Sequence, residues 1–170
     1  MIWNLAFGAV CAGVVGALIF DLWNWLAERA VGIRAPHWGI LGRWLLAPFN
    51  PAASPADGAA AEIFTAAERL LGTIAHYATA IAFALGLMLA MGPAWMAEPS
   101  LLPALVAGVV TTLFAWFIIM PALGAGVAGA RIPKPNRQRV ATLLSHAVMG
   151  AGFYVGAAAA AATPLYGAFS

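Results

Sequence analysis

The chain of 170 residues is too apolar and too sparsely charged for a water-soluble protein. Hydrophobic residues make up 64% of it, charged residues make up 8%, and the mean hydropathy is +0.90. A soluble domain carries about 25% charged residues, so there is too little charge here to cover a water-facing surface. With apolar runs long enough to cross a bilayer, this composition predicts an integral membrane protein in contact with lipid.

Cysteine content, charge and motifs exclude several classes of function. The single cysteine, Cys11, rules out an internal disulfide and a multi-cysteine zinc or iron–sulfur site. The net charge of +2 does not indicate a nucleic-acid partner, because membrane topology explains the basic residues better. The chain has no Walker-type phosphate loop and no GxSxG, HExxH or CxxC motif, so the familiar nucleophile and phosphate-binding sites are absent.

Apolar runs predict four membrane-spanning helices in a single domain of residues 1–170. In the first helix, Gly and Ala recur at four-residue spacing, which lets helix backbones approach closely, and we expect this stripe to pack inside the protein. Gly92 with Pro93 is expected to end the second helix, and Pro121 to end or kink the third. The expected spans are about residues 2–26, 71–91, 101–120 and 140–162.

The two long connections, residues 27–70 and 121–139, are expected to lie in the cytoplasm. In the first, the segment HWGILGRWLLAPF (37–49) mixes tryptophan and arginine with apolar residues and predicts a short helix in the membrane interface. Asp57, in the turn-rich stretch that follows, is expected to cap the second spanning helix. In the second connection, the small-residue run 123–130 is expected to form either a loop or a re-entrant piece.

The positions of the basic residues predict the orientation of the chain. None of the eight lies at a terminus or in the turn between the second and third spans: they are Arg29, Arg34, Arg43, Arg69, Arg131, Lys134, Arg137 and Arg139. Positively charged connections stay in the cytoplasm, so both termini are expected on the periplasmic side of a bacterial inner membrane. The last four residues could also bind anionic headgroups, although simple topology signalling is the favoured interpretation.

Three ionisable side chains lie inside the predicted spans: Asp21, His76 and His146. The first helix runs toward the cytoplasm, and the second and fourth helices start there. At about 1.5 Å rise per residue, the three side chains are expected in one layer near the cytoplasmic third of the membrane. Ionisable groups at this depth are costly and mark an internal polar site. Their expected neighbours are Asn24, Arg43, Tyr77 and Ser145.

Several interpretations of this layer stay open. The favoured one is a hydrogen-bonded cluster that fixes the register of the helices. Two imidazoles and a carboxylate also form a ligand set for zinc or ferrous iron, and two histidines can bind haem. Titrating Asp and His side chains would equally suit a proton relay or a substrate pocket. No cofactor is favoured, and no residue is assigned a catalytic role.

Four stretches of the sequence together resemble the sequence pattern of one protein family. They are GILGRWLL (39–46), AHYATAIAFAL (75–85), GPAWMAEPSLLPAL (92–105) and MPALGAGVAGARIPKPNRQRVATLLSHAVMGAGFYVG (120–156). In this combination the chain resembles a family of bacterial integral membrane proteins catalogued as domain of unknown function 2938. The resemblance implies an inner-membrane protein with four spans, and it supplies no activity, substrate or catalytic residue. The positions that match the family pattern are Asp21, Gly42, Arg43, His76, Tyr77, Pro121, Gly124, Pro133, Arg139, His146 and Gly150.

The sequence therefore predicts an all-α, four-span transmembrane helical bundle with a short interfacial helix in its first cytoplasmic connection. The first functional hypothesis is a structural or accessory protein that contacts itself or a larger membrane complex, and it predicts a packed, dry polar layer. The second is a membrane-embedded metal or haem protein, or an enzyme acting on a lipid-soluble substrate, and it predicts an open pocket. An oligomeric transporter or channel ranks third, because no two related halves with broken helices are present.

Overall fold

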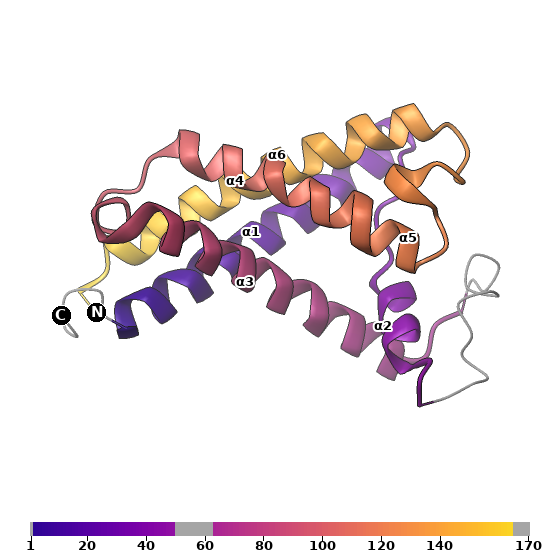
Figure 1. Ribbon diagram of the computed structural model, residues 1–170, viewed down its shortest axis with the longest axis horizontal. Coiled ribbons are helices and arrows are strands. Elements are labelled where there is room, and N and C mark those ends of the chain that lie inside the picture. The colour runs from indigo at the N-terminus through magenta and orange to yellow at the C-terminus, as the bar shows by residue number, and fades with distance from the viewer. Residues whose placement is uncertain (1, 50–62, 165–170) are drawn as a thin grey trace.

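The computed structural model describes residues 2–49 and 63–164, which form a bundle of helices (Figure 1). Helices α4 and α5 and the π-helix between them form one rod, Leu101–Ala122. Four helical stretches are thus long and apolar enough to cross a membrane, which confirms the predicted bundle. In chain order the elements are α1 Ile2–Val31, α2 Trp38–Leu46, α3 Ala66–Ala97, α4 Leu101–Phe114, the π-helix η3 Ala115–Ile119, α5 Met120–Ala122, the 3₁₀-helix η4 Val127–Gly129 and α6 Pro135–Ala161.

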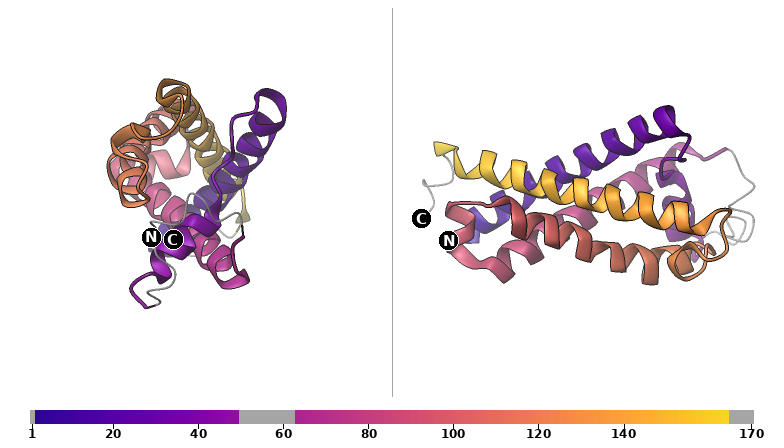
Figure 2. Two further views of the ribbon diagram at one scale, coloured as in Figure 1. Left: turned by 90° about the vertical axis from the view of Figure 1, so that its right-hand side faces the viewer. Right: turned by 90° about the horizontal axis from the view of Figure 1, so that it is seen from above.

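Helices α1 and α6 form the centre of the bundle. Helix α1 packs against α6 and α3, α4 packs against α6, and α2 packs against the start of α3. The beginning of α1, the turn between α3 and α4 and the end of α6 lie at one end of the molecule (Figures 1 and 2). Helix α2 and the connection from α5 to α6 lie at the other end, which we call the α2 end.

Small residues set how closely the two central helices approach. A Cβ atom on Gly152 would lie 2.7 Å from the Cα atom of Gly16, and one on Gly156 would lie 2.6 Å from the Cα atom of Ala12. The backbones of α1 and α6 are therefore almost in contact, as the small-residue stripe in the first helix predicts. In lipid no hydrophobic effect draws helices together, so such dispersion contacts supply much of the packing.

Glycines also allow α2 and α3 to approach closely. A Cβ atom on Gly42 would overlap the carbonyl oxygen of Glu68, and one on Gly72 would overlap the carbonyl oxygen of Trp38. At the start of α2, the backbone N–H of Gly39 donates to Nδ1 of His37 at 3.2 Å. The short helix expected within residues 37–49 is thus present, and it lies directly on the first turns of α3.

Helix α3 begins with a capping box at Thr65 and Glu68. The backbone N–H of Glu68 donates to the Thr65 hydroxyl at 3.2 Å, and the backbone N–H of Thr65 donates to the Glu68 carboxylate at 2.7 Å. The predicted cap, Asp57, lies outside the described residues. Helix α3 is interrupted at Gly92, whose φ of 77° favours glycine, and then continues to Ala97, beyond the expected end of the span.

Pro121 marks the end of the third spanning stretch. Proline has no backbone N–H to donate, and the chain forms the π-helical turn Ala115–Ile119 directly before it and leaves the helix after Ala122. Residues 123–130 form a loop with one short 3₁₀ turn, and re-entry of this loop into the membrane stays a prediction. The guanidinium of Arg139 holds this loop by donating from Nε to the carbonyl oxygen of Ala128 at 3.0 Å.

Replacing Gly72 with alanine is expected to push α2 away from α3 and to destabilise the bundle by about 1–3 kcal/mol, as overpacking typically does. Gly86→Ala on the same helix is the control, because a Cβ atom there meets nothing within 4 Å and alanine favours the helix. Thermal unfolding of both variants in detergent measures the difference. Equal stability of the two variants would contradict the close approach of α2 and α3.

Candidate functional site

The polar layer is arranged around the ring of Phe20. The centroid of this ring lies 5.5 Å from the imidazole of His76 and 5.5 Å from the imidazole of His146. Both histidines are buried, with 8% of each residue exposed. Helix α1 supplies Phe20, α3 supplies His76 and α6 supplies His146, so three helices meet at this ring.

His76 contacts both Trp38 and Asp21. The indole of Trp38 stacks on the imidazole with 3.8 Å between ring centroids. Nε2 of His76 lies 3.4 Å from Oδ1 of Asp21, yet the geometry is not that of a hydrogen bond, and this nitrogen is buried with no partner among the described residues. Asp21 accepts hydrogen bonds from Trp38 Nε1 and from the Tyr77 hydroxyl, both at 3.2 Å. Asp21 thereby links α1 to α2 and α3.

His146 is bound by Thr111 on the side that faces α4. Its Nδ1 lies 2.8 Å from the Thr111 hydroxyl oxygen, which in turn lies 2.6 Å from the carbonyl oxygen of Gly108. A Cβ atom on Gly108 would collide with the backbone of His146 and Gly150, so α4 and α6 cross closely at this point. The close crossing brings the Thr111 hydroxyl within hydrogen-bond distance of the imidazole.

Asn24 and Ser145 connect α1 to α6 next to Phe20. The Ser145 hydroxyl donates to Oδ1 of Asn24 at 2.9 Å, and Nδ2 of Asn24 donates to the carbonyl oxygen of Phe20 at 2.8 Å. Both side chains are buried. This pair is the part of the layer whose geometry matches a cluster that fixes helix register.

Arg43 binds Glu68 instead of joining the groups around Phe20. Its Nε lies 2.7 Å from Oε1 of Glu68, and Nη2 donates to the carbonyl oxygen of Ile63 at 2.9 Å. The hydrogen bond with Glu68 raises the pKa of the Arg43 guanidinium above its ordinary value. The ion pair ties α2 to the first turn of α3, so Arg43 holds a wall of the site in place.

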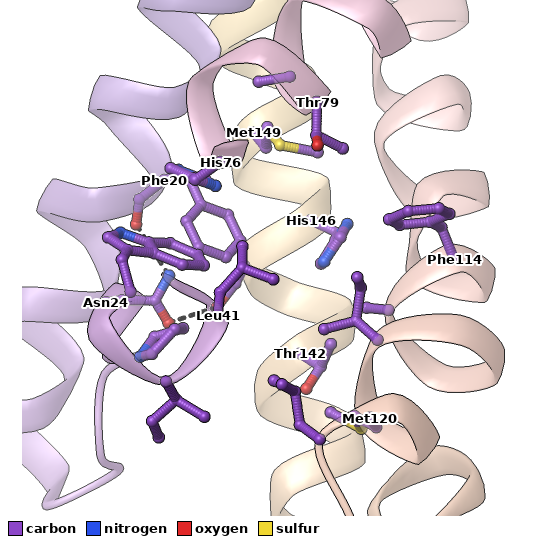
Figure 3. Close-up of a pocket in the computed structure, with 18 of the residues that line it drawn as sticks. Phe20, Asn24, Leu41, His76, Thr79, Phe114, Met120, Thr142, His146 and Met149 are labelled. Atoms are coloured by element: carbon purple, nitrogen blue, oxygen red, sulfur yellow. Dashed lines mark hydrogen bonds between the residues drawn. The ribbon is translucent and has the colours of Figure 1, made fainter. Parts of the chain in front are cut away.

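A cavity of about 260 Å³ lies beside the two histidines. Most of its wall is aromatic or aliphatic, and α1, α2, α3, α6 and the Leu101–Ala122 rod all contribute to it. Figure 3 shows His146 projecting into this space between Thr142 and Phe114, with His76 and Phe20 across from it. The side chains that bring polar atoms to the wall are Asn24, His37, Trp38, His76, Thr79, Gln138, Thr142, Ser145 and His146.

The side chains of the expected layer, Asp21, His76 and His146, are not all in contact with one another. Asp21 contacts His76, whereas His146 lies against another part of Phe20 and bonds to Thr111. Within residues 2–49 and 63–164, no three His, Cys, Asp or Glu side chains are placed to hold a metal ion. The Phe20 ring packs against both imidazoles. Axial haem ligation would instead require both imidazoles to face the iron. The metal and haem hypotheses stay predictions without geometric support.

The basic residues of the α5–α6 connection lie at the α2 end and do not line the cavity. Arg137 donates to the carbonyl oxygen of Val31 at the end of α1, and Arg139 donates to Oδ1 of Asn136 at 2.8 Å. Arg131 and Lys134 are exposed. Two of the four residues expected at anionic headgroups thus also hold the chain together, and headgroup binding stays a prediction.

Sequence reasoning does not reveal three residues that shape the site. Phe20 has no signal that sets it apart from other apolar positions, and the pattern around Trp38 indicates only an interfacial helix. Thr111 belongs to the pair Thr111–Thr112, whose hydroxyls are the only polar groups between Leu101 and Phe114 in α4. That pair is the one signal from which a partner for His146 could have been inferred.

These features define a multi-pass helical membrane protein with a buried polar layer and a cavity beside it. The chain belongs to the family described as "Protein of unknown function (DUF2938)", whose model matches residues 10–160. The match extends from α1 into the last turn of α6 and includes every residue of the layer. No curated protein and no solved structure matches the chain.

Ser145→Ala is expected to destabilise the bundle by about 1 kcal/mol, because the buried Oδ1 of Asn24 loses its only side-chain donor among the described residues. Ser100→Ala is the matched control, since Ser100 is exposed and makes no capping hydrogen bond from its side chain. A double-mutant cycle with Asn24→Ala, followed by thermal unfolding, isolates the pair. Additive effects of the two substitutions would show that the bond across α1 and α6 does not form.

Proposed function

We propose that the protein binds a small lipid-soluble molecule in the cavity beside His76 and His146. The observation that carries this proposal is the cavity: about 260 Å³ inside the bundle, with a mostly apolar wall and a few polar groups. Ligand sites in proteins have this composition, because apolar walls supply affinity and a few polar groups supply orientation. A ring compound or a short lipid-like molecule with one or two polar groups has the complementary chemistry.

The cavity favours ligand binding over a purely structural or accessory role. A structural layer is expected to be closely packed, with its polar groups satisfied inside the chain. Asn24 and Ser145 meet that description, but Nε2 of His76 is buried with no hydrogen-bond partner among the described residues, and the Asp21 carboxylate lies 3.4 Å away. Close packing would also leave no volume of this size beside the histidines.

The position of the cavity supports entry from the lipid phase. Its wall includes Phe83 of α3 and Phe114 of α4, whose rings meet edge to face with 5.3 Å between centroids. Nearby on the Leu101–Ala122 rod, Phe117 and Ile118 are 57% and 54% exposed and would face lipid in a membrane. A molecule dissolved in the bilayer would reach the cavity between these helices without crossing a polar surface.

The charge distribution supports a location in a bacterial inner membrane with both termini periplasmic. Figure 1 places the helix ends that carry the basic residues at the α2 end of the bundle, away from the start of α1 and the end of α6. Positively charged segments stay in the cytoplasm. The α2 end would therefore face the cytoplasm.

Organic extraction of protein purified in nanodiscs, followed by mass spectrometry, is expected to release a stoichiometric small molecule. Ala115→Leu should reduce its amount severalfold, because Ala115 lines the cavity and the larger side chain fills it. Ala82→Leu on the exposed face of α3 is the control and should retain the molecule. Wild-type protein that yields no such compound, and that binds no added apolar compound, would return the layer to a structural role.

Labelling of single cysteines in intact cells tests the orientation, in a Cys11→Ser background. A membrane-impermeant maleimide is expected to label Ser100→Cys, in the turn between α3 and α4, and to leave Asn136→Cys unlabelled until the cells are lysed. Both positions are exposed, so accessibility in the folded protein is matched. The opposite pattern would place the α2 end outside the cell.

A further inference from the structure

The proton on the Thr111 hydroxyl determines which nitrogen of His146 carries hydrogen. The hydroxyl oxygen lies 2.6 Å from the carbonyl oxygen of Gly108 and 2.8 Å from Nδ1 of His146. A hydroxyl has one proton to donate, and a carbonyl oxygen can only accept. Both short contacts are hydrogen bonds only if Thr111 donates to Gly108 and Nδ1 of His146 donates to Thr111.

This arrangement leaves Nε2 of His146 as a hydrogen-bond acceptor. In a neutral imidazole with its proton on Nδ1, the other nitrogen carries a lone pair. No described side chain donates a hydrogen bond to Nε2, and the imidazole lines the cavity (Figure 3). A hydrogen-bond acceptor in an apolar wall costs free energy when it has no donor. The cavity therefore favours a ligand that donates a hydrogen bond to this nitrogen.

The hydroxyl groups of the cavity wall cannot supply this donor, because each already donates within the protein. Thr79 donates to the carbonyl oxygen of Ala75 and Thr142 to that of Gln138, both at 2.8 Å. The Ser145 hydroxyl donates to Asn24 at 2.9 Å. Around His146 the wall therefore presents lone pairs rather than hydroxyl protons.

The remaining wall favours a ring. The rings of Phe20 and His146 are nearly perpendicular, with 85° between their planes, and Phe83 and Phe114 meet edge to face at the boundary between α3 and α4. Aromatic side chains prefer such offset and edge-to-face contacts with other rings. A dry cavity of about 150 Å³ holds benzene, and the cavity here, of about 260 Å³, is larger.

We propose that the ligand is a ring compound with a hydroxyl group, which donates its hydrogen to Nε2 of His146. This inference rests on the proposed function, because it names the class of molecule that the cavity binds. The ring lies among Phe20, Phe83 and Phe114, and the hydroxyl points toward α6. A matching compound whose oxygen is methylated has the same ring but no donor, so it leaves Nε2 unpaired and binds more weakly.

Calorimetric titration tests this with 2-naphthol and 2-methoxynaphthalene, on protein washed free of its co-purified molecule before assembly into nanodiscs and with empty nanodiscs as the reference. We expect 2-naphthol to bind wild-type protein about tenfold more tightly, the effect of one well-placed hydrogen bond. Thr111→Val keeps the side-chain shape but removes the hydroxyl that fixes the Nδ1 proton, so the preference should fall to about twofold or less. Thr112→Val is the matched control, since the Thr112 hydroxyl is buried without a partner among the described residues.

The outcomes separate this inference from the proposed function. Binding of neither compound to wild-type protein would overturn both. Equal binding of the two compounds would leave the cavity as a binding site but overturn the donor requirement. A preference that survives Thr111→Val would overturn the role given to Thr111. Nitrogen-15 NMR of histidine-labelled wild-type protein reports the tautomer without any substitution, and a protonated Nε2 in neutral His146 would contradict the inference directly.

Discussion

The close approach of helix backbones at small residues is the constraint on which the rest of this structure depends. Glycines bring α1 and α6 into near contact at Gly16 and Gly152, and the crossing of α4 on α6 at Gly108 follows the same rule. Lipid offers no hydrophobic gain for helix association, so dispersion contacts at these crossings and a few buried hydrogen bonds must hold the bundle together. Any side chain at these positions would separate the helices.

These crossings also decide where the bundle stays open. Helix α3 is held by α1 and α2, and α4 is held by α6, so α3 and α4 meet through larger side chains such as Phe83 and Phe114. The cavity lies in the space between these pairs, next to the polar layer. The close crossing of α4 and α6 at Gly108 also places the Thr111 hydroxyl against His146. The same contact between helices therefore determines both their packing and the hydrogen bond to His146.

In the candidate site, the depth of a side chain along its helix can be predicted from the sequence, but the side chains that it contacts cannot. Helical rise and chain direction place Asp21 and His76 at a similar depth, and the two side chains are in contact in the structure. Rise alone does not say which face of a helix a side chain occupies relative to its neighbours. Helix α6 is rotated so that His146 faces Thr111, and the Phe20 ring packs against both imidazoles. Both features depend on where the glycines of three helices meet.

The sequence by itself determined the class of this protein and its layout. Apolar runs, sparse charge and breaks at Gly92 and Pro121 are local properties, so they identify the helices long and apolar enough to cross a membrane and the short helix after His37 without tertiary information. The partners of Arg43 and His146 lie 25 and 35 residues away along the chain. Only the tertiary structure decided these pairings and the cavity, because both depend on how whole helices cross in three dimensions.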